Sequence, residues 1–163
     1  MSQATFRAVQ DNDRRALSEF ITSFWRSERM VSRGRLFYTA QQEGFIADKE
    51  GKITGCITFE RQGDEMEITL LDSRERQQGT GTLLLEMTIE HARAQGCRRV
   101  WLIATNDNIR AIRFYQKRGF DLVQIHRNAI EVSRRLKPEI PATGQEGIPI
   151  RHELEFEFVF YIR

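Results

Sequence analysis

One segment of the chain combines a strand pattern, a loop with two close glycines and a helix pattern. The strand-like run "EMEITLLD" ends at Asp72, and "RERQQGTG" follows it. From Thr80 to Gln95 the apolar residues recur at helical spacing, and Gly96 is placed to end the helix. We therefore predict a strand over 64–72 and a helix over 80–95, joined by a short glycine loop.

The remaining patterns predict a sheet around this unit. We expect strands at 5–9, 44–48, 52–61, 98–106, 120–127 and 152–162. Glycine-containing turns at 50–51 and 62–63 join the strands between 44 and 72 into an antiparallel meander. A helix capped by Asp11 or Asn12 precedes the meander, and a helix over 108–118 follows the strand at 98–106. This order predicts an α/β (α+β) fold with a mixed, mostly antiparallel sheet flanked by helices.

Length and charge argue against several classes of function. The 163 residues fit one domain spanning 1–163, and a net charge of +2 with interspersed signs gives no reason to expect nucleic-acid or membrane binding. No stretch approaches the roughly eighteen apolar residues of a membrane span, and the N-terminus lacks the apolar core of a signal peptide. Two isolated cysteines favour a reducing compartment, so we expect a cytoplasmic protein.

The glycine loop is a candidate anion site because Gly79 and Gly81 lie where the predicted helix begins. The first N–H groups of a helix have no intrahelical partner and lie at the positive end of its dipole. Glycine lets a phosphate approach the backbone, and Thr80 and Thr82 can add hydroxyl donors. A purely turn-forming role is the alternative. A dinucleotide fingerprint would need glycine in place of Leu84, and a P-loop would need Gly-Lys-Ser/Thr, so neither fits.

A second motif lies in "NDNIRAIRFYQKRGF", residues 106–120. It has the form N-x-x-A-x-x-F-Y-x-x-x-G-F from Asn108 to Phe120. Together with R-Q-Q-G-T-G at 76–81, this pattern closely resembles the GNAT superfamily of N-acetyltransferases. The resemblance is specific over about residues 65–120. It implies a sheet whose two central strands splay apart, and a cofactor, acetyl-CoA (coenzyme A), bound at that splay.

The resemblance also assigns residues to the cofactor. The glycine loop would cradle the pyrophosphate through backbone amides, the strand before it would pair with the pantetheine arm, and Asn108 would hold the cofactor from the second motif. The implied cofactor-binding residues are Leu70, Leu71, Asp72, Arg76, Gln77, Gln78, Gly79, Thr80, Gly81, Thr82, Asn108, Ala111 and Phe114.

Two residues are candidates for proton transfer. The resemblance implies that Tyr115 protonates the leaving thiolate, and the reaction does require a proton donor there and a neutral attacking amine. Glu67 is our candidate general base, because strand alternation puts it on the face opposite Met66, Ile68 and Leu70. A solvated strand glutamate is the alternative reading of Glu67. Asp72, Glu65 or a chain of water molecules could also serve as the base.

The acceptor site is less defined. Arg29, Arg33 and Arg35 cluster around Gly34 in a segment that overhangs the acceptor side in GNAT-like folds. An arginine fork would recognise a carboxylate or phosphate, so we expect an acceptor with an anionic group, bound by Arg33. A solvated helix end is the alternative. The proline-containing loop 138–149 can shape a pocket, serve as a scaffold or form a dimer contact.

The sequence thus predicts an acetyl-CoA-dependent N-acetyltransferase that transfers the acetyl group directly to a primary amine of a small molecule or peptide. We expect no acetyl-enzyme, since neither cysteine lies in a motif. No metal is expected, because the three histidines lack metal-ligand spacing. A monomer and a homodimer both remain open. The alternative function is a non-catalytic acyl-CoA-binding or sensing module, which could dispense with Tyr115 and a base.

Overall fold

The computed structural model describes residues 3–25, 27–75 and 78–161. Within these residues seven strands form one sheet, and two further strands form a separate hairpin. The sheet order is β1 (Thr5–Ala8), β4 (Glu43–Lys49), β5 (Lys52–Gln62), β6 (Glu65–Ser73), β7 (Arg99–Thr105), β9 (Glu153–Val159) and β8 (Asp121–His126). The hairpin consists of β2 (Arg29–Ser32) and β3 (Arg35–Tyr38).

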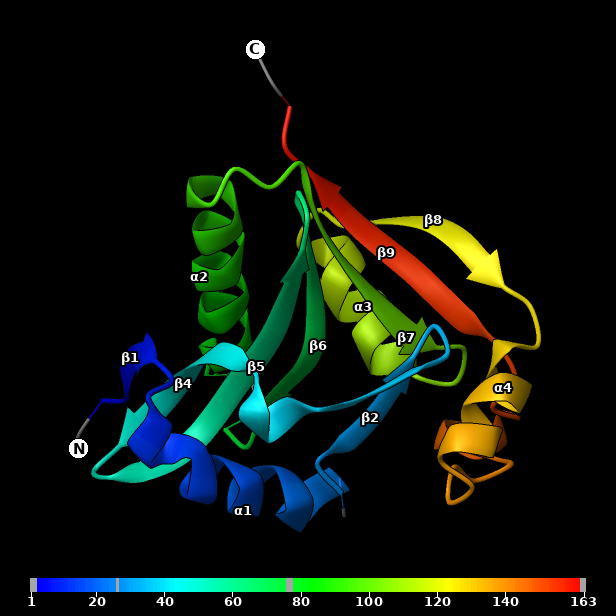
Figure 1. The fold of residues 1–163 in the computed structure, drawn as a ribbon, viewed down its shortest axis with the longest axis horizontal. Helices are drawn as coiled ribbons and strands as arrows, with labels where there is room; N and C mark the ends of the chain where they lie inside the picture. Colours follow the sequence, from blue (N-terminus) through cyan, green and yellow to red (C-terminus); the bar gives the residue numbers. More distant parts are fainter. Residues whose placement is uncertain (1–2, 26, 76–77, 162–163) are drawn as a thin grey trace.

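The helices cover both faces of the sheet (Figure 1). The described helices are α1 (Arg14–Trp25), α2 (Thr80–Ala94), α3 (Ile109–Lys117) and α4 (Ala129–Leu136), with short 3-10 turns η1 (Asp11–Asp13), η2 (Thr39–Gln41) and η3 (Gln145–Gly147). The strand pair β6 and β7 is parallel, and the other pairs of the sheet are antiparallel. The expected mixed, mostly antiparallel sheet flanked by helices is confirmed.

Two apolar clusters hold the layers together. On one face, Leu17 and Ile21 of α1 pack against Ile46, Cys56 and Leu70 of the sheet. On the other face, α2 and α3 cover a larger cluster whose fully buried members include Ile57, Leu84, Val100 and Phe156. Burial of this apolar surface is the main source of stability for such a layered fold.

A bulge in β6 corrects one detail of the expected strand pattern. The pairing with β5 shifts by one residue between Thr58 and Phe59, which leaves Thr69 as the extra residue of β6. A bulge reverses the alternation of side chains beyond it. Leu70 therefore lies in the α1 cluster, while Met66 and Ile68 lie on or near the α2 face, so Glu67 and Leu70 share one side of the sheet.

The hairpin and α4 were not anticipated from the sequence. The hairpin turns at Arg33 and Gly34, whose φ values of 51° and 74° are those of a two-residue turn with both central residues left-handed. Its strands are four residues each, too short for a clear alternation. The expected strands and helices otherwise occur with ends shifted by a few residues; β9, for example, ends at Val159.

The two faces of α2 give a stability test. Leu85 is 1% exposed and Leu83 is 39% exposed on the same helix. Leu85→Ala should lower the free energy of unfolding by about 2–5 kcal/mol, because it leaves a cavity in the larger cluster. Leu83→Ala, the matched control, should cost less than about 1 kcal/mol. Chemical denaturation measures both, and equal losses would contradict the assignment of the buried face.

Candidate active site

A cavity lies where β6 and β7 separate. Within the described residues their pairing ends at Ile68 and Leu102, and beyond that point the two strands diverge. The segments 69–71 and 103–105 then line a cavity of about 190 Å³. The hairpin covers it on the side of the sheet opposite α3 (Figure 1). The expected splay between the two central strands is therefore present.

Glu67 lies in this cavity and is 4% exposed. The Ser32 hydroxyl donates to its Oε1 at 3.0 Å, and the Arg35 guanidinium donates to its Oε2 at 3.3 Å. Burial raises the pKa of Glu67, while the bonds from Ser32 and Arg35 partly oppose that rise. A carboxylate with a raised pKa is a stronger base than a solvated one. The partners of this carboxylate, Ser32 and Arg35, both belong to the hairpin.

The two competing carboxylates lie elsewhere. Asp72 forms an ion pair with Arg74 at 3.2 Å, and Glu65 accepts hydrogen bonds from Arg98 and Arg99. Neither residue lines the cavity between β6 and β7. Among the carboxylates named from the sequence, Glu67 is the one that could reach a bound amine.

Tyr115 reaches the same cavity from α3 and is 7% exposed. Its hydroxyl makes no hydrogen bond to any described residue. Since every fully buried side-chain oxygen or nitrogen among the described residues has a partner, this hydroxyl is not fully buried. The hydroxyl is therefore open to the cavity. Burial raises the pKa of Tyr115 above its ordinary value, so the phenol keeps its proton at neutral pH.

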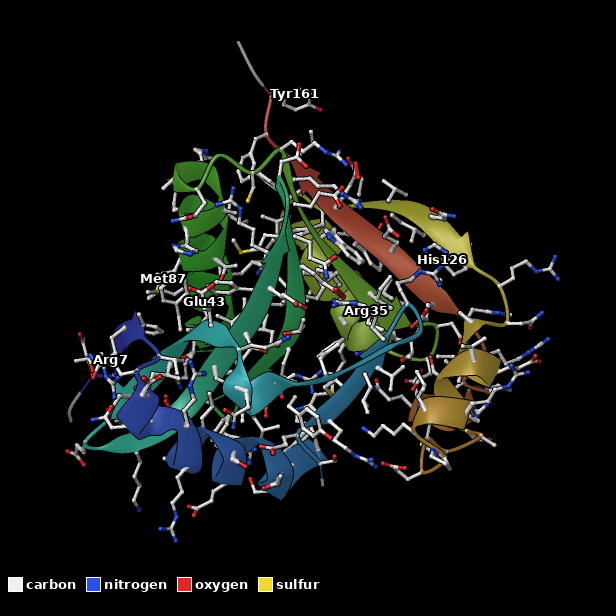
Figure 2. The ribbon with its side chains drawn as sticks, viewed as in Figure 1. Arg7, Arg35, Glu43, Met87, His126 and Tyr161 are labelled. Carbon is white, nitrogen blue, oxygen red and sulfur yellow. The ribbon has the colours of Figure 1, made fainter. Side chains whose placement is uncertain are left out.

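The three hairpin arginines are each paired with a carboxylate. Arg29 contacts Glu139 at 2.6 Å, and Arg35 contacts Glu60 at 3.0 Å in addition to Glu67. Figure 2 shows Arg35 reaching from the hairpin over the sheet. None of the three lines the cavity between β6 and β7. The expectation that Arg33 binds an acceptor stays a prediction. An acceptor would have to compete with a carboxylate that Arg33 already contacts.

That carboxylate belongs to Glu153, at the start of β9. Arg33 donates to both Glu153 oxygens, from its backbone N–H to Oε2 at 3.2 Å and from its guanidinium to Oε1 at 3.1 Å. Glu153 is 2% exposed and lines the cavity. Arg33 makes this double contact from a left-handed backbone with φ 51°.

The glycine loop leads into α2 as expected. Gly79 is the N-cap residue with φ 77°, and the N–H of Leu83 donates to its carbonyl at 3.0 Å. The N–H groups of residues 80–82 precede that first helical bond and remain for a ligand. Gln78 is exposed beside them. Arg76 and Gln77, both expected at the cofactor, lie outside the described residues.

The two loop threonines have different surroundings. Thr80 is buried, and its methyl group lies so close to Gly55 that a Cβ there would come within 2.9 Å of it. Thr82 accepts a hydrogen bond from Nε of Arg118 at 2.8 Å. The Thr80 side chain is thus packed inside the protein, whereas the Thr82 hydroxyl is paired with the Arg118 guanidinium.

The second motif places three residues around the start of α3. Asn108 caps the helix by accepting from the N–H of Ala111 at 3.2 Å, and Ala111 lines the cavity. The Phe114 ring lies beside the glycine loop, where a Cβ on Gly81 would be 3.6 Å from it. Leu70 and Leu71 line the cavity from β6. Of the expected cofactor residues, Leu70, Leu71, Asn108 and Ala111 line the cavity, whereas Asp72 does not.

Sequence reasoning missed several residues of this site. Arg118 stacks 3.8 Å above the centre of the Phe114 ring and brings a cation to the glycine loop. Its position just before Gly119, at the end of the second motif, was the available signal. Ser32 and Glu153 lie on segments distant in sequence from the motifs, and no local pattern marks them. Trp25 and Phe37 also line the cavity.

Hydrogen bonds join the loop 138–149, and the residues that follow it, to the turn between β7 and α3. Asn106 accepts from the N–H of His152 at 2.9 Å and donates to the carbonyl of Pro149 at 2.9 Å. Asp107 is 5% exposed and accepts from the N–H of Gln145 at 3.2 Å. These bonds support the scaffold reading, since they fix the chain that leads to Glu153.

Metal ligands, membrane-spanning helices and reactive thiols were also sought among the described residues. No group of three or more histidine, cysteine or acidic side chains is placed to hold a metal among the described residues. None of the described helices is long and apolar enough to cross a membrane. Cys56 and Cys97 are both buried free thiols that lie outside the cavity lining, and burial raises the pKa of each.

Known proteins share both the sequence and the fold. The model of the acetyltransferase (GNAT) family matches residues 13–120. The uncharacterised protein YdhI of Bacillus subtilis (strain 168) is 43% identical over 144 residues, which cover 88% of this chain and 90% of YdhI.

Two solved structures illustrate the likeness of the fold. A GNAT family acetyltransferase from Elizabethkingia anophelis with acetyl-CoA bound has a TM-score of 0.68 and 17% identity, covering 98% of this chain and 100% of that chain. A Bacillus subtilis acetyltransferase in complex with CoA has a TM-score of 0.68, 15% identity and the same coverage. The matched segment contains the splayed strands, the glycine loop and the Tyr115 helix, and the chain belongs to the GNAT family of acetyltransferases.

Proposed function

We propose that this protein is an acetyl-CoA-dependent N-acetyltransferase that transfers the acetyl group directly to a primary amine. One observation carries the proposal: Glu67 and Tyr115, a base and a proton donor from different elements, line the same cavity between β6 and β7. A screen of amines with the purified protein and acetyl-CoA, scored by release of free thiol, tests it. Binding of acetyl-CoA without thiol release from any amine would favour a sensing module.

The residues present fit acetyl-CoA. Its phosphates suit the helix start at residues 80–82, where free N–H groups, the helix dipole and the Arg118 guanidinium favour an anion. Its pantetheine arm suits the edge of β6 that faces the splay, where Leu70 and Leu71 have lost their neighbour in β7. Solved GNAT structures with acetyl-CoA or CoA bound support this choice of cofactor. When bound, acetyl-CoA supplies the activated acetyl group.

The side chains then divide the proton transfers. The amine nitrogen forms a bond to the thioester carbonyl carbon and passes one proton to Glu67. The carbon–sulfur bond breaks, and the departing sulfur receives a hydrogen bond and a proton from the Tyr115 hydroxyl. Both cysteines lie outside the cavity, which supports direct transfer without an acetyl-enzyme.

Gly81→Glu should abolish acetyl-CoA binding, because it adds a negative charge beside the phosphates. Gly81→Gln has the same bulk without the charge and should bind more tightly than Gly81→Glu. Gly81→Ala should fold normally, since its Cβ would make an ordinary contact with Phe114 at 3.6 Å. Isothermal titration calorimetry measures all three. If Gly81→Glu binds acetyl-CoA as tightly as the parent protein, the glycine loop only forms a turn and does not bind the phosphates.

Tyr115→Phe should lower kcat by about a hundredfold or more, the usual contribution of a positioned general acid, with little change in acetyl-CoA affinity. Tyr161→Phe is the matched control, because Tyr161 is 90% exposed and lies outside the cavity lining. Steady-state thiol release measures both variants. An unchanged kcat in Tyr115→Phe would return this residue to a packing role.

Glu67→Gln should lower kcat at neutral pH, and the deficit should shrink as pH rises, because an amine that is already neutral needs no base. In the parent enzyme the rate should fall as pH falls through the raised pKa of Glu67, since protonation removes the base. Glu65→Gln is the control, because Glu65 lies outside the cavity lining. A deficit independent of pH would argue against a base at Glu67.

A further inference from the structure

The charge of the cavity lining is informative about the acceptor. Among the described residues that line the cavity, Glu67 and Glu153 are the carboxylates, and none is a lysine, arginine or histidine. Both glutamates are at most 4% exposed. A ligand in the cavity therefore meets two buried acidic groups and no cationic side chain.

Both carboxylates retain acceptor capacity toward a ligand. Each oxygen of Glu67 accepts one described hydrogen bond, from Ser32 or from Arg35, and each oxygen of Glu153 accepts one from Arg33. An ionised carboxylate offers about four lone-pair sites. The two arginine side chains are 40% exposed and lie outside the lining, so they offset the buried charges from the solvent side.

The rest of the acceptor end is apolar. Trp25, Met30, Val31 and Phe37 line the cavity from α1 and the hairpin. Aromatic faces attract cations as well as apolar groups, and methionine adapts to varied shapes. These walls suit the body of an amine and bring no cationic side chain to a second anionic group; their one side-chain donor is the indole N–H of Trp25.

Tyr115 supplies a separate observation that the cavity is built for a ligand. Its side chain is more than nine-tenths buried, and its hydroxyl has no partner among the described residues although it opens into the cavity. The hydroxyl can therefore donate a hydrogen bond to a group bound in the cavity.

We propose that the acceptor is a primary amine on an aromatic or aliphatic body, without a carboxylate or phosphate beside the amine, and that Glu153 selects it by charge. This inference rests on the proposed acetyl transfer. The protonated amine enters toward Glu67 and Glu153. Glu67 takes its first proton before attack and releases it to solvent, and it then accepts the second proton as the amide forms. Glu153, which Arg33 contacts at 3.1 Å, disfavours anionic acceptors. Arg33 is then a positioning residue for Glu153, which replaces its expected role as an anion receptor.

Phenethylamine and phenylalanine form a matched pair of probes, because they differ only by one carboxylate. With acetyl-CoA in excess, kcat/KM from thiol release should be at least about tenfold higher for phenethylamine, since a carboxylate would be desolvated beside two buried glutamates. Tryptamine and tryptophan give a second pair of the same design. Phenylalanine acetylated as well as phenethylamine overturns the inference and leaves acetyl transfer standing.

Variants connect the preference to Glu153. Glu153→Gln should raise the KM for phenethylamine by about tenfold and bring the preference for phenethylamine over phenylalanine closer to one. A merely structural role would lower both activities without changing their ratio. Glu157→Gln, on the same strand but outside the lining, should leave the ratio unchanged. An unchanged ratio in Glu153→Gln overturns the selection role.

Arg33→Gln distinguishes selection of a cationic amine by Glu153 from binding of an anionic acceptor by Arg33. It also provides a test if Glu153→Gln fails to fold. It keeps the backbone N–H that donates to Glu153 and removes the offsetting charge. The KM for phenethylamine should rise, but less than in Glu153→Gln, because the side-chain bond that positions Glu153 is lost while the backbone N–H still donates to it. Phenylalanine should be used no worse than by the parent enzyme. An unchanged KM for phenethylamine, or the poorer use of phenylalanine that an anion receptor at Arg33 would require, overturns the inference.

A direct binding measurement covers the case of no turnover. If acetyl-CoA binds but no amine releases thiol, the proposed transfer fails, and calorimetry with CoA-loaded protein then decides the acceptor class. Phenethylamine should bind at least about tenfold more tightly than phenylalanine, and this difference should shrink in Glu153→Gln. Equal binding, or no binding of phenethylamine, overturns the inference.

Discussion

The end of the pairing between β6 and β7 is the feature on which the site depends. The strands run parallel as far as Ile68 and Leu102 and then diverge. Divergence leaves backbone groups of β6 without a strand neighbour and opens space between the layers. Polar backbone groups in such a gap need partners, so the gap favours an extended polar ligand. The bulge at Thr69 lies at the same point and turns Leu70 toward the α1 side.

The hairpin is held over this gap by charged groups as well as by the apolar side chains of Met30 and Phe37. Its residues Ser32, Arg33 and Arg35 donate to buried carboxylates of β6 and β9. Buried ion pairs contribute little net stability, but removing one partner is costly because the other charge is left uncompensated. The pairs therefore fix where the hairpin lies more than they hold the fold together. Their geometry keeps the arginines on the solvent side and the carboxylates on the cavity side.

The sequence predicted what local patterns encode. The strand meander, the helices at 80–95 and 108–118, and the glycine stops at Gly96 and Gly119 follow from periodicity and turn chemistry, and both glycines have positive φ. The sequence did not predict the hairpin, because its strands have only four residues each. Its turn also uses Arg33, a residue type that seldom adopts positive φ. The helix Ala129–Leu136 was not predicted because its eight residues are too few for a clear helical repeat.

The candidate site divides in the same way. Tyr115 and the glycine loop lie in motifs that span a few residues, so the sequence alone could name them. Glu153 lies 120 residues from Arg33, and their contact depends on the path of the whole chain. Sequence reasoning saw the arginines without their carboxylates, and so it inferred an anionic acceptor.

With the partners in place, the same arginines have the opposite meaning. Burying a negative charge is costly unless a cation or hydrogen-bond donors compensate it. Arg33 and Arg35 provide that compensation for Glu153 and Glu67, respectively. As receptors for an anion, they would have to share with the substrate the charge that already offsets two buried carboxylates. The hairpin cations are therefore better explained as the groups that keep the cavity acidic, and an acidic cavity attracts an amine in its protonated form.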